Sequence, residues 1–440
     1  MEHPHSPVRR PRRRTALATL TALAIGAGAT ASAGGLHRPG PPAGASARTG
    51  TGPDGSLSAA EARLAPCRIA GAKGVQLSAG LATGDEYARS TGRIRALTLM
   101  IDFSDAQGED PASHRYAEFF PQTTQWFTTS SYGRLDYRPE RPIPGWLRMP
   151  RPFEAYGIER GSPFEPGYRK LLKDIAAAAD DRVDFDRYDL VNVLVTPNAG
   201  PSALETVLSV TFSGNGDAPR ADGVRLGNVS FVYSRQDDGS GSYRQTGFRV
   251  LPHENNHAFG LPDLYTPDGG GAAGHWDIMS EDWGANNDLL GWHKWKLGWL
   301  DDSQIACAPA PGRTEYRLQP LHRPKAQPGP PTRLVFVPLD DSTGYAVEVR
   351  TQGGNDEGVC RPGVLVYRVD ANVDTGRGPV TVSDATPDSG GCTRLPNVHP
   401  ELSDATYVEG GTFTDDDNGL RIEVLDADGD GQHTVRVTRR

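Results

Sequence analysis

Two histidines four residues apart are the feature that most constrains how this 440-residue chain can fold. His253 and His257 flank Glu254 in the segment Pro-His-Glu-Asn-Asn-His. Residues four apart lie on one face of an α-helix, so both imidazoles can point at the same place. Pro252 lacks an N–H and should open or kink this helix, and Gly260 can adopt the left-handed conformation that ends it. The sequence therefore predicts a short helix with two imidazoles on one side.

Two imidazoles in this arrangement are suited to bind one metal ion. The turn after Gly260 can bring Asp263 back as a third ligand, and Glu281 is the alternative third ligand. Three protein ligands leave the fourth position of a tetrahedral zinc site open for water, as a catalytic zinc requires. Glu254 projects beside the metal, where its carboxylate can take a proton from water. The simpler alternative is a surface helix with two solvated histidines.

A methionine follows this segment at a spacing typical of one class of zinc peptidases. Met279 lies in the stretch Gly-His-Trp-Asp-Ile-Met-Ser, about 20 residues after the second histidine. A methionine in a tight turn beneath the metal is the second mark of the metzincin peptidases. A lone methionine usually fills core space, so it is the position after the histidines that favours the metzincin interpretation.

Together these segments resemble the immune inhibitor A family of secreted bacterial metallopeptidases. The resemblance rests on residues 253–265 and 276–280 and extends over about residues 93–440. Further similar stretches are residues 97–105, 131–133, 292–299, 345–350 and 363–367. The resemblance implies a zinc peptidase acting on protein or peptide substrates, with the two histidines as ligands and the glutamate between them as the base. Asn256 departs from the family, which often has glycine before the second histidine; this departure concerns helix packing and not catalysis.

The distribution of apolar residues divides the chain into four segments. We expect a signal peptide at residues 1–33, a linker or short pro-segment at 34–92, a zinc-peptidase domain at 93–305 and a second domain at 306–440. In the peptidase segment, strand-like runs alternate with helical periodicity, which predicts a mixed α/β (α+β) domain. The resemblance implies that this domain is of metzincin type. The expected strands are residues 96–103, 190–195 and 229–233, and the expected helices are residues 116–128 and 168–179.

The last segment has a different pattern. Short apolar strands follow one another with turn residues between them, which predicts an antiparallel β-sandwich. The expected strands are residues 315–318, 332–337, 345–349, 364–369, 420–424 and 433–437.

The N-terminus has the composition of an export signal. Five arginines between residues 9 and 14 precede the small apolar stretch 15–25 and the motif Ala31-Ser32-Ala33, which is typical of a cleavage site. A basic tail without a targeting role is the alternative. No other apolar run is long enough to cross a bilayer, so we expect a secreted, extracellular protein with no membrane span. The net charge of −9 argues against a nucleic-acid partner, because phosphate binding needs a basic surface.

Four cysteines form an even set, which in an oxidising compartment predicts two disulfides. Three pairings are possible, and local spacing suggests Cys360 with Cys392 and Cys67 with Cys307. Alternatively, the thiolate of Cys67 could cap the zinc in a latent form, because this residue precedes the catalytic domain.

An acidic segment near the C-terminus resembles the opening of a calcium-binding loop. Residues 426–431 read Asp-Ala-Asp-Gly-Asp-Gly, with oxygen ligands at alternate positions. The glutamate expected at loop position twelve is replaced by Val437. Calcium binding and a plain acidic hairpin turn therefore both remain open.

The sequence thus predicts a secreted zinc-dependent endopeptidase. Two other functions share the same ligands. One is a zinc hydrolase that acts on non-peptide amides. The other is a catalytically inactive zinc protein whose β-sandwich binds surfaces or glycans, and the intact Glu254 counts against this interpretation.

Overall fold

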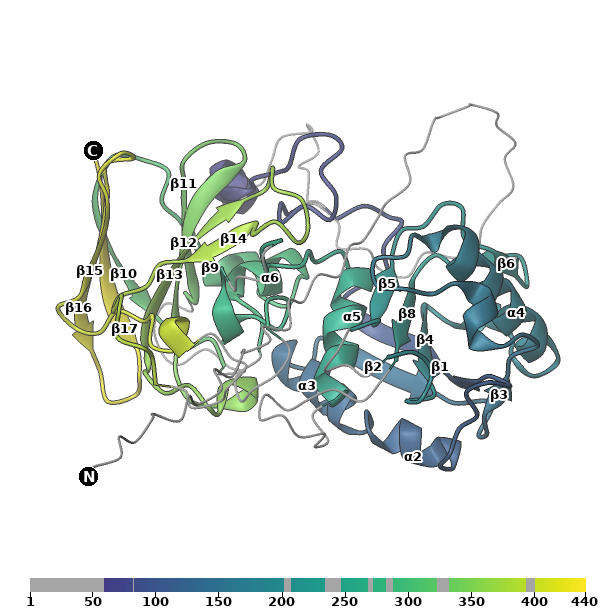
Figure 1. Cartoon of the computed structure of the whole chain (residues 1–440). Helices are drawn as coiled ribbons and strands as arrows, with labels where there is room; N and C mark the ends of the chain where they lie inside the picture. The colour runs from purple at the N-terminus through teal and green to yellow at the C-terminus, as the bar shows by residue number, and fades with distance from the viewer. Residues whose placement is uncertain are drawn as a thin grey trace, which may run out of the picture.

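The computed structural model describes residues 59–81, 83–201, 207–233, 247–267, 272–281, 288–322, 332–392 and 400–440. The expected export signal lies outside these ranges. The chain forms a mixed α/β part followed by a part made of two packed sheets (Figure 1). The mixed α/β class expected from the sequence is therefore confirmed. Within the described ranges, no helix has the length and apolar character needed to cross a bilayer.

The α/β part is built on one sheet with the strand order β2-β1-β4-β8-β5. Its first four strands are parallel, and β5 runs antiparallel to β8 at one edge. A short strand, β3, pairs with the end of β1. The strands are β1 (Gly92–Asp102), β2 (Leu135–Glu140), β3 (Leu147–Arg148), β4 (Leu190–Val195), β5 (Val210–Phe212) and β8 (Val229–Val232). A separate hairpin is formed by β6 (Arg220–Ala221) and β7 (Val224–Arg225).

Helices cover both faces of this sheet (Figure 1). α3 (Gln122–Ser130) and α5 (Val250–Ala258) pack on one face, and α4 (Arg169–Ala179) packs on the other. The side chains of β1 alternate between the two cores, as a strand buried on both faces requires. The helix expected at 116–128 is two helices, α2 (Ala112–Ala117) and α3, because Pro121 between them interrupts the helical hydrogen bonds.

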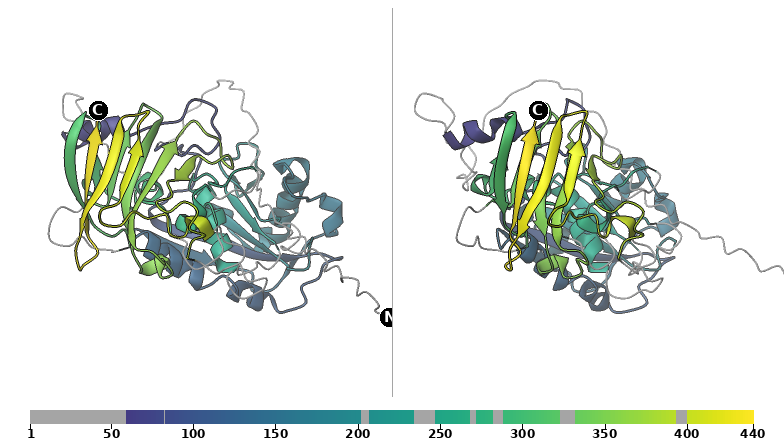
Figure 2. Two further views of the ribbon diagram at one scale, coloured as in Figure 1. Left: turned by 60° about the vertical axis from the view of Figure 1, so that its left-hand side comes forward. Right: turned by 90° about the vertical axis from the view of Figure 1, so that its left-hand side faces the viewer.

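The C-terminal part consists of two facing sheets. One has the order β14-β13-β12-β11-β9, and the other has the order β10-β17-β16-β15, seen face on in the right-hand view of Figure 2. A core of mostly branched aliphatic side chains lies between them. All neighbouring strands are antiparallel except β9 and β11. The strands are β9 (Ile305–Cys307), β10 (Gly312–Leu318), β11 (Leu334–Pro338), β12 (Thr343–Arg350), β13 (Gly363–Asp370), β14 (Val380–Val382), β15 (Thr412–Asp415), β16 (Leu420–Ala427) and β17 (His433–Arg439).

The two parts share a hydrophobic core. Leu251 of α5 belongs to the same buried cluster as Phe336 of β11 and Tyr367 of β13. Trp292, in α6 (Gly291–Lys296), stacks on Phe336 with 4.3 Å between ring centroids. The boundary that the sequence places near residue 305 therefore separates the helices and strands of the two parts, but the hydrophobic core extends across it.

A buried arginine of the C-terminal part also joins the two parts. Arg350 of β12 contacts Glu348 at 3.0 Å and Asp356 at 2.8 Å, and it donates a hydrogen bond to the carbonyl oxygen of Trp276. None of these three charged side chains is more than 1% exposed. A buried charge left without its partner is strongly destabilising, so the two carboxylates are needed to keep this guanidinium buried. The hydrogen bond to the carbonyl oxygen of Trp276 links the C-terminal sheet to the segment that carries Trp276.

The N-terminal segment is part of the folded structure from α1 (Ala59–Leu64) onward. The sequence places the start of order near Arg93 and interprets residues 34–92 as a linker or pro-segment. Instead, four side chains of the segment are buried: Leu64, Cys67, Ile69 and Ala79. These few apolar residues are spaced irregularly and pack against distant parts of the chain, so no local pattern reveals them.

Both suggested disulfides are confirmed, Cys67 with Cys307 and Cys360 with Cys392. The first one attaches the N-terminal segment to β9. Because the sulfur of Cys67 is used in this bond, the alternative in which its thiolate caps a metal is wrong.

Replacing Arg350 with methionine should lower the free energy of unfolding by about 3–5 kcal/mol, because Glu348 and Asp356 would remain buried without their cation. Urea denaturation followed by circular dichroism measures this change. The matched control is Arg368→Met on neighbouring β13, where a 45%-exposed side chain pairs with Asp370 at 3.6 Å; its loss should stay below about 1 kcal/mol. Equal effects of the two substitutions would contradict the role given to the buried pairs.

Candidate metal centre

The histidine-bearing segment forms helix α5, as the sequence predicts. Pro252 is the third residue of this helix, where its missing N–H leaves no hydrogen bond unmade. The helix ends at Ala258, and Gly260 follows with a φ of +91°. The N–H of Leu261 donates to the carbonyl oxygen of Asn256 at 3.0 Å, which closes the last turn. This left-handed glycine redirects the chain toward Asp263.

Three side chains converge at one buried point. The Oδ1 atom of Asp263 lies 3.1 Å from Nε2 of His253 and 3.2 Å from Nε2 of His257. Two ligand atoms bound tetrahedrally to one zinc ion, each about 2.0–2.1 Å from it, would be about 3.3 Å apart. The three residues are between 1% and 7% exposed, and they are the only group of three or more metal-binding side chains that the described ranges contain. Their spacing and chemistry fit a divalent metal ion.

Hydrogen bonds to the rest of the protein hold the sides of these three residues that face away from the centre. Nδ1 of His253 donates to the carbonyl oxygen of Ile278 at 2.8 Å, and Nδ1 of His257 donates to that of Leu261 at 2.8 Å. These bonds leave the Nε2 lone pairs facing the centre. The backbone N–H of Asp263 donates to the hydroxyl of Thr375 at 2.8 Å, and this hydroxyl lies 3.4 Å from Oδ2 of the same aspartate.

The charges of the group also suit a cation. Burial acts to raise the pKa of Asp263, but the imidazoles of His257 and His253 outweigh it and lower that pKa below its ordinary value. Burial acts to lower the pKa of His257, but the carboxylate of Asp263 outweighs it and raises that pKa. Oδ1 of Asp263 is buried and accepts no hydrogen bond of normal geometry within the described chain. A buried anionic oxygen without a donor is a suitable ligand for a cation.

The turn that contains Met279 supports the centre through its backbone. The carbonyl oxygen of Ile278 orients His253, and that of Met279 accepts the N–H of Leu264 at 2.9 Å, next to the third ligand. Asp277 secures the turn, because its carboxylate accepts the N–H groups of Met279 and Leu290, each at 2.8 Å. The side chain of Met279 is fully buried in the shared core.

Glu254 lies next to the first histidine and is 4% exposed. The hydroxyl of Thr211, in edge strand β5, lies 2.8 Å from Oε2 of this glutamate. Burial raises the pKa of Glu254 above its ordinary value. Its carboxylate is therefore held in position by a strand that lies far from it in the sequence.

The other candidate residues lie outside the group. Glu281, the alternative third ligand, is buried but does not belong to the set of converging side chains. His293 contacts Asp277 at 2.8 Å, with both side chains fully buried, and so serves the turn. His275 and Tyr265, which lie near the motif in the sequence, are also buried.

The acidic segment near the C-terminus forms the hairpin turn between β16 and β17. Oδ1 of Asp428 accepts the N–H groups of Asp430 and Gln432, and Oδ2 pairs with Arg317 at 2.8 Å. Both carboxylate oxygens are therefore used within the protein. This part of the acidic segment is therefore a hairpin turn held together by its own hydrogen bonds and one ion pair.

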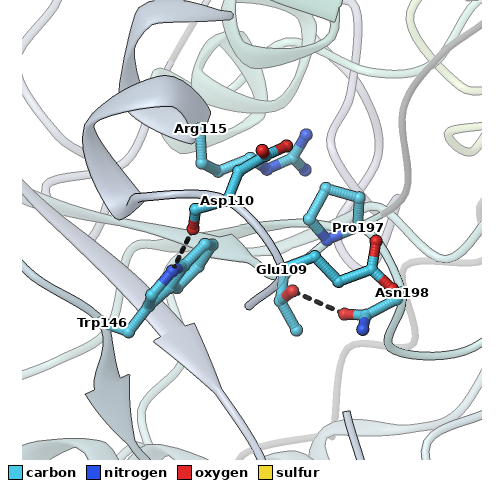
Figure 3. A pocket seen from close by; sticks show the side chains of 7 residues that line it. Glu109, Asp110, Arg115, Trp146, Pro197 and Asn198 are labelled. Carbon is cyan, nitrogen blue, oxygen red and sulfur yellow. Dashed lines mark hydrogen bonds between the residues drawn. The ribbon is translucent and has the colours of Figure 1, made fainter. Parts of the chain in front are cut away.

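A small cavity of about 150 Å³ lies at the carboxyl ends of β1 and β4, where the strand order of the sheet reverses (Figure 3). Ligands of open α/β sheets often bind at such a point. Here, however, polar groups that line the cavity bond to one another: the indole N–H of Trp146 donates to the carbonyl oxygen of Asp110, and the hydroxyl of Thr196 donates to Oδ1 of Asn198. The cavity shares no residue with the metal group.

Two residues of the centre were not found from the sequence, Thr211 and Thr375. Threonine is not part of a recognisable metal-binding motif. Thr211 lies in β5 and contacts Glu254 of α5, and Thr375 lies in the loop after β13 and contacts Asp263. Only the spacing of the histidines, the glutamate and the aspartate carries a signal that sequence inspection can find.

Neither a scan against protein-family models nor a search of curated proteins finds a match for this chain.

Replacing Asp263 with asparagine should abolish tight binding of a divalent metal, because the charged ligand is lost. The matched control is Glu281→Gln, which removes the rival carboxylate and should leave one bound metal ion per chain. Titration of the purified, metal-stripped proteins with Zn²⁺ in a calorimeter measures both. The reverse outcome would make Glu281 the third ligand.

Replacing Thr375 with valine should weaken metal binding about 10–100-fold, as the loss of a residue that orients a ligand typically does. Competition with a chromophoric chelator measures the affinity. Thr381→Val, at an exposed position of neighbouring β14, is the control and should bind as the wild type does. An unchanged affinity in Thr375→Val would show that Asp263 does not need this contact.

Proposed function

We propose that this protein is a secreted zinc-dependent endopeptidase of the metzincin type, related to the immune inhibitor A family. The observation that carries the proposal is the convergence of Nε2 of His253, Nε2 of His257 and Oδ1 of Asp263 beside Glu254. Two imidazoles and one carboxylate with an adjacent glutamate form the ligand set and base of a zinc hydrolase.

The chemistry can be assigned to individual side chains. The two histidines and Asp263 would hold the zinc ion, which when bound supplies the Lewis acidity that activates water and polarises a carbonyl group. The carboxylate of Glu254 accepts a proton from the water that attacks the peptide carbonyl, and it passes this proton to the nitrogen of the leaving amine. The buried surroundings strengthen each electrostatic contact, because few water molecules screen it.

The position of β5 supports a peptide substrate over a small amide. This strand lies at the edge of the sheet, and no strand in the described part of the chain pairs with its outer side. Thr211, in the middle of β5, contacts Glu254, so this edge lies beside the proposed base. Extended peptides bind exposed strand edges through main-chain hydrogen bonds. A peptide bound in this way would pass the catalytic glutamate.

The two disulfides support the secreted location. Such bonds form and persist in oxidising compartments and are rare in the cytosol. Together with the arginine-rich, apolar N-terminus, they favour export of the protein.

Hydrolysis of casein by three samples tests the proposal: the wild type, Glu254→Ala and chelator-treated wild type. We expect activity only in the first sample and its recovery in the third on addition of Zn²⁺. Loss of the base should reduce kcat by about 10²–10⁴-fold, while the variant keeps one zinc ion per chain. Small non-peptide amides assayed in parallel identify the substrate class.

Each possible outcome has a clear meaning. If Glu254→Ala cleaves casein as fast as the wild type, the assigned base is wrong. If the wild type binds zinc and cleaves only small amides, the protein is an amidohydrolase. Bound zinc without any hydrolysis would favour a binding protein.

A further inference from the structure

A series of hydrogen-bonded, buried polar side chains leads from the sheet to Glu254. Strand β5 pairs antiparallel with β8, and this register places Thr211 directly opposite Ser230. Their hydroxyl oxygens are 2.8 Å apart. The amide of Asn255, in α5, lies 2.9 Å from the Ser230 hydroxyl. Thr211, Ser230 and Asn255 thus form a continuous path that ends at Oε2 of Glu254.

The direction of the hydrogen bonds in this chain is determined at its far end. The hydroxyl of Tyr137 donates to Oδ1 of Asn255 at 2.7 Å, and this hydroxyl in turn accepts a hydrogen bond from the amide of Asn192 at 2.8 Å. Burial raises the pKa of Tyr137, so its O–H remains a donor. Nδ2 of Asn255 must then donate its two hydrogens, one to Oδ1 of Asn192 at 2.9 Å and one to Ser230.

The remaining hydrogens follow from this order. Ser230 accepts from Asn255, and its oxygen lies 2.8 Å from that of Thr211, so when Thr211 gives its single hydrogen to Glu254, the hydrogen between the two hydroxyls comes from Ser230. Thr211 can then give its hydrogen to Glu254, whose Oε2 and backbone oxygen both lie 2.8 Å away. The charged carboxylate is the stronger acceptor. If Thr211 donated its hydrogen to Ser230 instead, its lone pairs would face those of the Glu254 carboxylate at 2.8 Å, with no hydrogen between the two oxygens.

We infer that Thr211 is a positioning residue for the proposed base and that Asn255, within the histidine motif itself, supports it through Ser230. This inference rests on the proposed function of Glu254. Thr211 holds Oε2, and Oε1 accepts no hydrogen bond from any residue that the structure describes. One carboxylate oxygen is thereby fixed to the sheet, and the other is left for the proton that the reaction transfers. Thr211 acts through Glu254 and does not itself touch the substrate.

Because these hydrogen-bonded side chains are buried, each of them depends on its neighbours for its hydrogen bonds. Asn192, Asn255 and Ser230 are at most 1% exposed. Water cannot replace a missing partner there, so the loss of one hydroxyl leaves the neighbouring polar atoms unsatisfied. Without the contact to Thr211, the carboxylate of Glu254 samples more orientations, and catalysis is sensitive to such displacement.

Two substitutions at one position test the inference. Thr211→Val removes the hydroxyl and keeps the shape, whereas Thr211→Ser keeps the hydroxyl. We expect kcat on a peptide substrate to fall about 10–100-fold in Thr211→Val with KM unchanged, and to stay within about 3-fold of the wild type in Thr211→Ser. Both variants should bind one zinc ion per chain. In a crystal structure of metal-free Thr211→Val, we expect the Glu254 carboxylate in a different or second conformer.

A double substitution separates positioning from a general structural effect. If Thr211 acts through Glu254, then Thr211→Val should cause no further loss of activity in the Glu254→Ala background. Ser230→Ala provides a second test if Thr211→Val does not fold. It removes the donor to Thr211 and should lower kcat in the same direction.

The inference is overturned if Thr211→Val keeps the wild-type kcat, if Thr211→Ser is impaired equally, or if Thr211→Val lowers activity by the same factor in both backgrounds. These outcomes differ from failure of the proposed function. An inactive Glu254→Ala together with a fully active Thr211→Val removes only the role of Thr211. A fully active Glu254→Ala removes the assigned base and this inference with it.

Discussion

The close approach of two imidazole nitrogens and one carboxylate oxygen is the interaction on which the rest of this structure depends. Such a group is nearly removed from water, and Oδ1 of Asp263 has no hydrogen-bond donor of normal geometry among the residues that the structure describes. Burying a charge in this way is unfavourable unless another charge compensates for it. The imidazoles compensate in part, and a divalent cation at the same point would do so fully. The surrounding residues have one common effect, which is to keep these three atoms facing each other.

This requirement explains why segments far apart in the sequence pack together. The turn around Met279 orients one histidine, and the turn after Gly260 orients the other. A threonine from the loop after β13 holds the aspartate, and a threonine from β5 holds the adjacent glutamate. The C-terminal sheets are therefore not a separate module attached to a complete centre. They share its core, supply one of its contacts and are linked to the segment before the Met279 turn by a hydrogen bond from the buried Arg350 to the carbonyl oxygen of Trp276.

The sequence predicts the parts of this structure that depend on local spacing. The period of an α-helix places His253 and His257 together, and the strands of the sandwich follow from short apolar runs between turns. Contacts that depend on distant segments were not predictable in this way. Thr375 lies 112 residues from Asp263, and the apolar residues of the N-terminal segment have no regular period because their partners lie elsewhere. Pro121 was a local signal that periodicity alone passed over, and it divides one expected helix into two.

X-ray absorption spectroscopy of the purified, secreted protein tests the central claim most directly. We predict one zinc ion per chain, with a first shell of nitrogen and oxygen atoms at about 2.0–2.1 Å and scattering from two imidazoles. The absence of a firmly bound transition metal would contradict the account. So would a shell that contains sulfur, or one without imidazole scattering.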